Sequence, residues 1–261
     1  MEWETLKIEG EGPILQLVLN RPEKLNAISN QMLKDIVDAS FYLDSLPDCR
    51  SVILRGEGRS FSAGADLSEG ITHGGSSGQM MARSKMGARA VDALTEVNAI
   101  TIAALHGHVI GGAACLAMAC DFRIGATSTQ VSIRESSLGI SLSWHSIPNV
   151  VHLVGPTRAK EMIYFGEFYS AEKMLEYGFL EEVVDAKMLL ETAEKLAAKV
   201  VAQPPLPLTL SKSTINAVVK AMDRAICNLD EAGVTFTGKS HDSGLAREAL
   251  ATGESPLWRN E

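Results

Sequence analysis

Two glycine-rich turns and one glutamate are the residues of this sequence best suited to chemistry. The first turn is FSAGADL at residues 61–67, and the second is GHVIGG at residues 107–112. Glycine lets a ligand approach the backbone closely, and the free amides of a helix's first turn point toward a negative charge. Two such amides aimed at one oxygen form an oxyanion hole. Either turn alone would be an ordinary tight turn, but both at the same end of neighbouring strands favour a functional site.

The elements that must position these turns alternate between strand-like and helical patterns. Gly10, Gly12 and Pro13 predict a hairpin between the first two strands. Strands are expected at residues 3–8, 14–19, 51–55, 100–105 and 122–125. Residues 26–29 are expected to lead into a helix that runs to about Leu43, and further helices are expected at 79–97 and 113–120. The alternation predicts strand-helix units and a sheet that is at least partly parallel. The Gly/Ser-rich residues 70–78 are expected to form a flexible loop or lid.

The second half of the sequence is predominantly helical. Helices are expected at residues 157–165, 171–177, 186–201, 208–222, 225–236 and 240–251. The Gln203-Pro204-Pro205 run ends the helix before it. The sequence therefore predicts a core at residues 1–200 that carries the site, and a helical C-terminal subdomain at residues 201–261.

Composition excludes several functional classes. A net charge of −8 without a basic stripe argues against nucleic-acid binding. No apolar run is long enough for a membrane span, and the first residues do not resemble a signal peptide. Four irregularly spaced cysteines favour free thiols in the cytoplasm over disulfides or a zinc site.

Other motifs in the sequence do not indicate a nucleotide site, a serine nucleophile or a metal site. Nucleotide-binding GxGxxG and GxxxxGK[ST] patterns are absent, so neither NAD nor ATP is expected. The GxSxG match at residues 74–78 lies in the glycine-rich loop and lacks a preceding strand. His106 and His108 have no neighbouring carboxylate, and Cys115 and Cys120 lie in an apolar helix, so no metal is expected.

Several segments together resemble the crotonase superfamily of enoyl-CoA hydratases and isomerases. They are LNRPEKLNAIS, FSAGADL, HGHVIGGAACLAMACD, RESSLGI and VGPTRAKEMIYFGEFYSAEKMLEYGFLEEVV, which span residues 18–184 in the family's order and spacing. The resemblance implies an α/β fold, a spiral of ββα units with a helical C-terminal region. It also implies a homotrimer or a dimer of trimers, and an acyl-CoA thioester as substrate with no other cofactor.

The resemblance assigns residues to this chemistry. The backbone amides of Ala65 and Gly112 would hold the thioester oxygen and stabilise an enolate. The residues expected to contact the acyl-CoA are Lys24, Leu25, Ala27, Ala63, Asp66, Leu67, Gly111 and Trp144. Lys24 or Arg21 could meet a CoA phosphate, although a solvated surface charge explains either one equally.

The sequence departs from the family at the acid/base residues. Hydratases of the family use two glutamates, and here the first position holds Cys115 while the second holds Glu135. A thiol in an apolar helix has a raised pKa and replaces a carboxylate poorly. A single Glu135 could instead move one proton between two carbons, so double-bond isomerisation is favoured over hydration. Arg134 would lower the pKa of Glu135, and a surface carboxylate or a partner for Arg134 is the alternative reading.

A second departure follows at residues 141–145. Where hydratases carry a glycine-rich turn, Trp144 would narrow the site or line an acyl pocket, and His145 is either a second proton carrier or a structural residue. The alternatives to isomerisation are decarboxylation, C–C or thioester hydrolysis, and acyl-CoA binding without catalysis.

Overall fold

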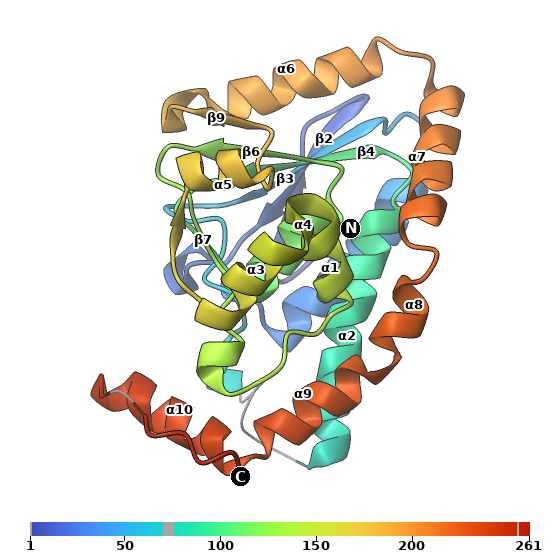
Figure 1. Ribbon diagram of the computed structural model, residues 1–261. Coiled ribbons are helices and arrows are strands. Elements are labelled where there is room, and N and C mark those ends of the chain that lie inside the picture. Colours follow the sequence, from blue (N-terminus) through green and yellow to red (C-terminus); the bar gives the residue numbers. More distant parts are fainter. Residues whose placement is uncertain (1, 70–75, 255) are drawn as a thin grey trace.

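The computed structural model describes residues 2–69, 76–254 and 256–261. A six-stranded sheet forms its centre (Figure 1). In spatial order its strands are β1 (Leu6–Glu9), β2 (Ile14–Leu19), β3 (Ser51–Gly56), β4 (Ile100–Leu105), β6 (Phe122–Ala126) and β9 (Glu182–Val184). Strand β1 pairs antiparallel with β2, and all the other pairs are parallel. The predicted parallel sheet is confirmed.

A smaller sheet carries the second glycine turn toward the site. It contains β5 (His108–Ile110), β7 (Gln130–Ser132) and β8 (Tyr169–Ser170). Strands β5 and β7 are parallel, whereas β7 and β8 are antiparallel. None of these short strands was predicted, because two or three residues give no readable alternation.

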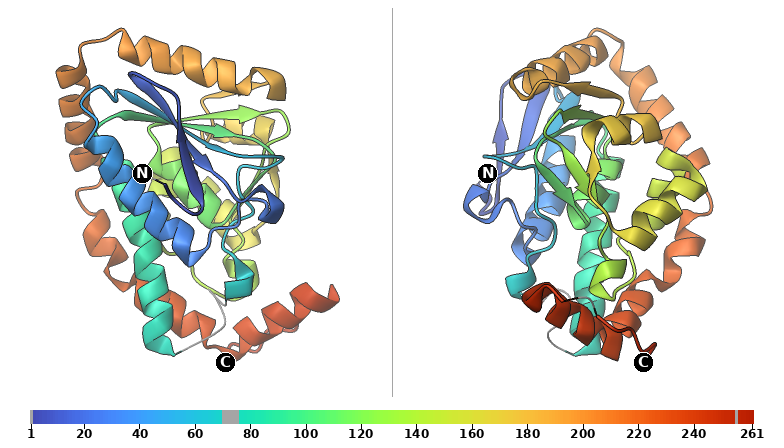
Figure 2. Two further views of the ribbon diagram at one scale, coloured as in Figure 1. Left: turned by 180° about the vertical axis from the view of Figure 1, so that it is seen from behind. Right: turned by 60° about the vertical axis from the view of Figure 1, so that its left-hand side comes forward.

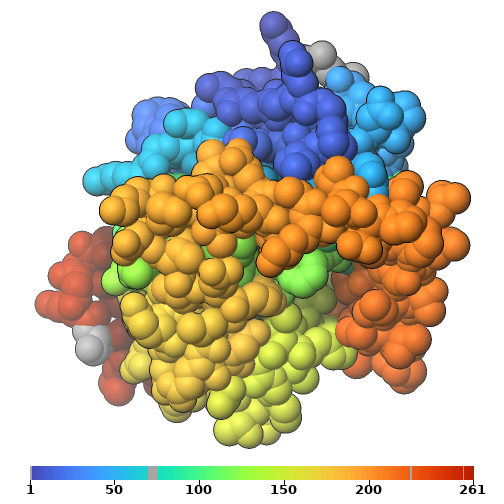
Figure 3. All heavy atoms as spheres, turned by 90° about the horizontal axis from the view of Figure 1, so that it is seen from above, coloured from blue at the N-terminus to red at the C-terminus, as the bar shows by residue number. Residues whose placement is uncertain are grey.

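Helices cover both faces of the main sheet. On one face, α6 (Leu189–Val201) packs against β3, β4 and β6 and closes a small apolar core (Figures 1 and 3). The other face carries the larger core, which includes α1 (Asn30–Asp44), α2 (Ser77–Glu96) and α3 (Gly112–Ala119). Ser29 caps α1 by accepting from the Met32 amide, and Ser76 forms a capping box with Gln79. Helix α3 is buried along its whole length, as predicted.

The remaining helices follow the predicted pattern with two differences. They are α4 (Ser146–Phe165), α5 (Ala171–Tyr177), α7 (Pro205–Val219), α8 (Asp223–Ile226), α9 (Asp230–Gly238) and α10 (His241–Thr252). Helix α4 starts eleven residues earlier than expected, because helical backbone continues on both sides of the non-helical Gly155. The single helix expected at 225–236 is interrupted by a 3₁₀ turn at Cys227–Leu229. The predicted loop at 70–78 lies mostly outside the described residues, and α2 begins within it.

The C-terminal helices lie along the edge of the molecule. Helices α7, α8 and α9 run beside α2, and α10 lies against the 3₁₀ turn at Ser136–Leu138 (Figures 1 and 2). Apolar side chains exposed on α7–α9 and the segments between them are Leu206, Leu210, Ile215, Val218, Val219, Met222, Ile226, Leu229 and Phe236, here called the C-terminal apolar face. Within the described ranges, no helix is long and apolar enough to cross a membrane.

Candidate active site

The two glycine turns lie against each other. Ser62 forms a parallel bridge with Val109, donating its amide to the His108 carbonyl at 2.9 Å and accepting from the Ile110 amide at 3.3 Å. Gly64 has a positive φ of 85°, and a Cβ there would lie 2.5 Å from the Ile110 carbonyl oxygen. Glycine is therefore required at residue 64 for the turns to approach this closely.

Ala65 and Gly112 both line one cavity of about 60 Å³. Gly112 is the first residue of α3, so its amide has no partner in a preceding helical turn. The neighbouring Asp66 amide donates to the Ile28 carbonyl, but among the described residues neither Ala65 nor Gly112 donates a backbone hydrogen bond outside a helix or strand. Both amides remain available to an oxygen placed in the cavity. The other lining residues are Asn30, Leu33, Met80, Arg83, Ser84, Cys115, Glu135, Ile140, Ser141, Leu142, Ser143, Trp144 and Val234.

Glu135 is held close to the second turn. It follows β7, immediately before a 3₁₀ turn at Ser136–Leu138. Gly111 donates its amide to the Ser132 carbonyl at 2.8 Å, and a Cβ on Gly111 would lie 2.7 Å from Glu135 Oε1. With φ at 53°, Gly111 also occupies a backbone conformation that favours glycine. Gly111 therefore makes room for the carboxyl group next to the Gly112 amide.

Burial controls the protonation of Glu135. Its Oε2 atom is buried and has no hydrogen-bond partner in the described structure. Desolvation raises the pKa of Glu135 from its ordinary value of 4.5 to about 7, because burial disfavours the charged form. A carboxyl group with this pKa is suited to accept and return a proton near neutral pH.

Arg134 does not act on Glu135 as expected. Its guanidinium lies over the Phe168 ring at 5.4 Å from the centroid, and it is not among the groups that shift the Glu135 pKa. The predicted lowering of that pKa by Arg134 is wrong. Reading Glu135 as a surface carboxylate is also wrong, because its carboxyl group is buried.

Cys115 lies one helical turn after Gly111 and lines the same cavity. Desolvation, together with the nearby charge of Glu135, raises the pKa of the Cys115 thiol far above neutral pH. The thiol therefore stays protonated and cannot serve as a second base. Glu135 is the only carboxylate among the residues that line the cavity.

Trp144 forms a wall of the cavity. Its indole packs between two glycines: a Cβ on Gly112 would lie 2.5 Å from the ring, and a Cβ on Gly87 of α2 would overlap it. Trp144 and His145 both have positive φ angles, of 61° and 55°. For residues other than glycine this backbone costs about 1–3 kcal/mol each, so surrounding contacts must hold it in place.

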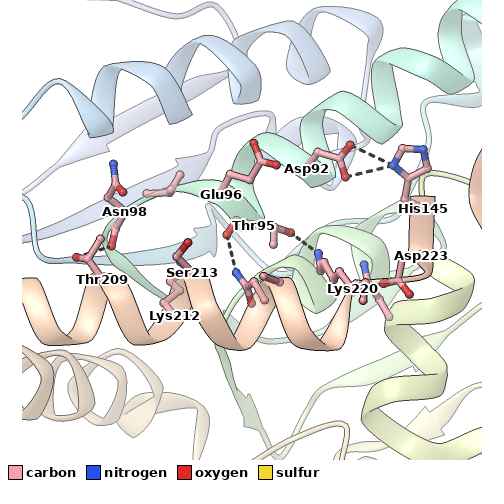
Figure 4. A pocket seen from close by; sticks show the side chains of 15 residues that line it. Asp92, Thr95, Glu96, Asn98, His145, Thr209, Lys212, Ser213, Lys220 and Asp223 are labelled. Atoms are coloured by element: carbon pink, nitrogen blue, oxygen red, sulfur yellow. Dashed lines mark hydrogen bonds and ion pairs between the residues drawn. The ribbon is translucent and has the colours of Figure 1, made fainter. Parts of the chain in front are cut away.

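His145 faces away from this cavity. Its Nδ1 lies 3.2 and 3.1 Å from the two carboxylate oxygens of Asp92. Both residues line a different cavity of about 520 Å³, between α2 and α7 (Figure 4). The structure therefore does not bring His145 to Glu135 as a second proton carrier.

Of the residues predicted to contact the acyl-CoA, those at positions 24–27 lie against the first turn, whereas Gly111 and Trp144 lie at the second turn and the cavity wall. The Ala63 amide donates to the Leu25 carbonyl at 2.9 Å, and the Ile28 amide donates to the Gly64 carbonyl at 2.8 Å. Arg21 pairs with Asp66 at 2.9 Å and is mostly buried, whereas Lys24 lies 3.8 Å from Asp66 and is half exposed. Lys24 is thus the better placed of the two cations for a phosphate, and the contacts to CoA stay a prediction.

The sequence analysis missed Asn26, which links the turn at residues 21–26 to the segment at residues 57–61. Its buried side chain donates to the carbonyls of Glu57, Ser60 and Phe61 at 2.8, 2.9 and 3.1 Å, and accepts from the Arg21 amide at 2.8 Å. Asn26 also has a positive φ of 53°, which asparagine tolerates better than most residues. An asparagine inside a turn was the only sequence signal for this role.

Comparisons with known proteins show the family of this chain. A family described as enoyl-CoA hydratase/isomerase matches residues 9–251. A crotonyl-CoA hydratase of Syntrophomonas wolfei is 29% identical over 94% of this chain and 95% of its own. A short-chain-enoyl-CoA hydratase of Clostridium acetobutylicum is 31% identical over 83% of this chain and 82% of its own.

Solved structures show the same fold. That of an enoyl-CoA hydratase from Mycobacterium avium subsp. paratuberculosis has a TM-score of 0.88 at 22% identity, covering 99% of this chain and all of the other. A second, from Geobacillus kaustophilus, has a TM-score of 0.78 at 27% identity over both whole chains.

The burial of Glu135 predicts a pH-dependent stability difference. Because its folded pKa of about 7 exceeds the ordinary 4.5, the folded state holds a proton that the unfolded state releases, and stability falls as pH rises between these values. Glu135→Gln removes this cost. It should raise the free energy of unfolding by on the order of 3 kcal/mol at pH 8 and by far less at pH 5, measured by urea unfolding. Equal gains at both pH values, or a gain in the exposed control Glu23→Gln, would show that Glu135 is not desolvated.

Proposed function

The chain belongs to the enoyl-CoA hydratase/isomerase family, and from this premise we propose that it moves the double bond of a short-chain enoyl-CoA by a 1,3-proton shift. One observation carries the proposal. A single carboxylate, Glu135, lines a cavity with the two amides of Ala65 and Gly112, while the second carboxylate position holds the protonated Cys115. One such group is sufficient for isomerisation, in which the same proton leaves one carbon and joins another.

The steps balance within the site. The thioester oxygen of a 3-enoyl-CoA accepts hydrogen bonds from the Ala65 and Gly112 amides, which makes the C2 protons acidic. Ionised Glu135 removes one of them, and the electron pair spreads over a dienolate whose oxygen stays on the two amides. The carboxylic acid then returns the proton to C4, leaving the double bond between C2 and C3. Each amide contributes about 3 kcal/mol of transition-state stabilisation in sites of this kind.

The cavity supports a short acyl chain. One buried water needs about 10–15 Å³ of such space, so about 60 Å³ holds on the order of four groups of that size. Trp144 would end the acyl pocket. The names of the two curated relatives, a crotonyl-CoA hydratase and a short-chain-enoyl-CoA hydratase, agree with this size. We assign the CoA portion to the cluster around Lys24, Leu25, Ala27, Ala63, Asp66 and Leu67.

Hydration is the second candidate, because both of these relatives are named hydratases. Adding water requires a group that positions and activates it as well as a group that delivers a proton to carbon. The Cys115 thiol, protonated at neutral pH, does not supply a second base. Isomerisation therefore stays the preferred reaction, and product analysis separates the two.

All four cysteines are free thiols, so we keep the cytoplasmic location as part of this proposal.

The proposal predicts the behaviour of Glu135 in catalysis. Wild-type protein should convert four- to six-carbon 3-enoyl-CoAs into 2-enoyl-CoAs, and Glu135→Gln should lower kcat at least about 100-fold, since general-base catalysis contributes this much. The wild-type kcat/KM should rise with pH and level off above about 7, because only ionised Glu135 removes a proton. Chromatography of the CoA products over a pH series measures all three.

Cys115→Ser is the matched variant for this experiment. The proposal expects it to isomerise within several-fold of wild type, because the thiol packs in the cavity without moving a proton. A 3-hydroxyacyl-CoA as the main product, lost equally in Cys115→Ser and Glu135→Gln, would replace isomerisation by two-group hydration. Free CoA as product would identify thioester hydrolysis, and carbon dioxide released from a malonyl-type thioester in a parallel assay would identify decarboxylation. Binding without any product would identify an acyl-CoA-binding protein.

We further propose that the chain assembles as a homotrimer or a dimer of trimers through the C-terminal apolar face. The proposal is supported by the nine apolar side chains exposed on this set of helices, because large exposed apolar patches mark interaction surfaces. Sedimentation should give three or six times the chain mass of 28.0 kDa. The double substitution Met222→Glu and Phe236→Glu should lower that mass, whereas Phe41→Glu, an exposed aromatic on α1, should not. A wild-type monomer would contradict this assembly.

A further inference from the structure

Helix α2 contacts the Trp144–His145 turn on two sides. Gly87 receives the indole of Trp144, and Asp92, five residues further along, pairs with the His145 imidazole. Figure 4 shows His145 and Asp92 pointing toward each other in direct contact, at one end of the large cavity between α2 and α7. The two consecutive left-handed residues therefore send one side chain into the candidate active site and the next to the opposite side.

Other bonds fix the same turn. The His145 amide donates to Asp230 of α9 at 3.0 Å, and Ser146 Oγ donates to the Trp144 carbonyl at 3.0 Å. The hydrogen-bonded pairing of His145 with Asp92 joins the turn to α2, the same helix against which the indole packs. A left-handed pair of bulky residues persists only where surrounding contacts over-determine it.

The indole also borders the groups that we propose to act on the substrate. It packs on Gly112, whose amide is one of the two proposed oxyanion donors, and it lines the cavity with Glu135. A shift of the turn would therefore move the wall that the acyl chain meets. Moving a wall by the width of a methylene group changes the free energy of transition-state binding for longer chains.

We infer that the Asp92–His145 pair is a positioning device: it holds the Trp144 indole as the end wall of the acyl pocket and so excludes longer acyl chains. Trp144 is then the specificity-determining residue, and Asp92 and His145 act through it. The inference rests on the proposed acyl-CoA function for its substrate, but the position of the indole is measurable without any turnover.

The charge on His145 gives this device a pH signature. The hydrogen bond to Asp92 raises the pKa of His145, so the pair is ionic below that pKa and is lost as pH rises through it. The charged groups that act on His145 are Asp92 of α2 and Asp230 and Glu231 of α9. Four further charged residues line the same cavity: Glu96, Lys212, Lys220 and Asp223. Glu135 titrates too, but it acts on every chain length alike, so its effect cancels in a ratio of rates.

The test measures the ratio of kcat/KM for four-carbon and ten-carbon 3-enoyl-CoAs. Trp144→Ala sets the open reference and should lower this ratio about tenfold or more. Asp92→Asn and His145→Gln should move the ratio toward that reference, mainly through KM for the longer chain. The wild-type ratio should fall above the pKa of His145, and in Asp92→Asn it should depend little on pH. His152→Gln is the matched control, because it breaks a different histidine–aspartate pair, the one between His152 of α4 and Asp223 of α8 at 3.2 Å.

A second readout does not need activity. In a Trp3→Phe, Trp258→Phe parent, Trp144 is the only tryptophan, and its buried indole should emit at short wavelength. Asp92→Asn in this parent should shift the emission to longer wavelength, while His152→Gln should not. If no enoyl-CoA is turned over, the proposed function fails, and the emission shift together with calorimetric affinities for the two acyl-CoAs decides the positioning role. Unchanged emission and unchanged ratio in both Asp92→Asn and His145→Gln, or an equal effect of His152→Gln, would overturn it.

Discussion

The close approach of residues 62–65 to residues 109–112 is the constraint on which the candidate site depends. Two glycines permit it, since a Cβ on Gly64 would strike the Ile110 carbonyl and a Cβ on Gly111 would strike the Glu135 carboxyl group. The main sheet sets the two turns side by side, because they follow the adjacent parallel strands β3 and β4. The small sheet then carries Glu135 to the same place through β5 and β7.

The site combines a buried carboxyl oxygen that has no hydrogen-bond partner with two backbone amides that have no acceptor in the described structure. Nothing bonded to Glu135 Oε2 stabilises its charge, so the carboxyl group is held near neutral pKa at a cost to folding. The amides of Ala65 and Gly112 supply positive partial charges. A full cation in their place would lower the pKa of Glu135 and make it a weaker base. The anion-binding half of the site is therefore complete in backbone alone, while the proton-transferring half consists of one side chain. The C-terminal helices contribute by closing the cavity with Val234 and by presenting an apolar face.

The α/β fold, the parallel sheet and the buried helix at Gly112–Ala119 could be predicted from the sequence. Apolar stretches of strand or helix length, with glycine turns between them, are strong local signals. The sequence also placed Glu135, Ala65 and Gly112 in one site, which their spacing and the family resemblance indicated. Contacts that depend on complementarity across many residues were not readable, such as Trp144 seated on Gly87 or Asn26 bonded to three carbonyls. The effect of Arg134 on the pKa of Glu135 was misjudged for the same reason, since the guanidinium lies over the Phe168 ring instead. For His145 the sequence left two roles open, and its pairing with Asp92 agrees with the structural one.

Infrared spectroscopy of a bound substrate tests the central claim most directly. A four-carbon enoyl-CoA carrying ¹³C at the thioester carbonyl would be bound to the Glu135→Gln protein, which retains both amides and should turn the substrate over far more slowly. If Ala65 and Gly112 hold that oxygen, the carbonyl stretch should move to lower frequency than in water, because two hydrogen bonds in a dry cavity weaken the bond more than solvent does. A bound thioester whose carbonyl stretch matches its value in water would contradict the oxyanion hole and the mechanism built on it.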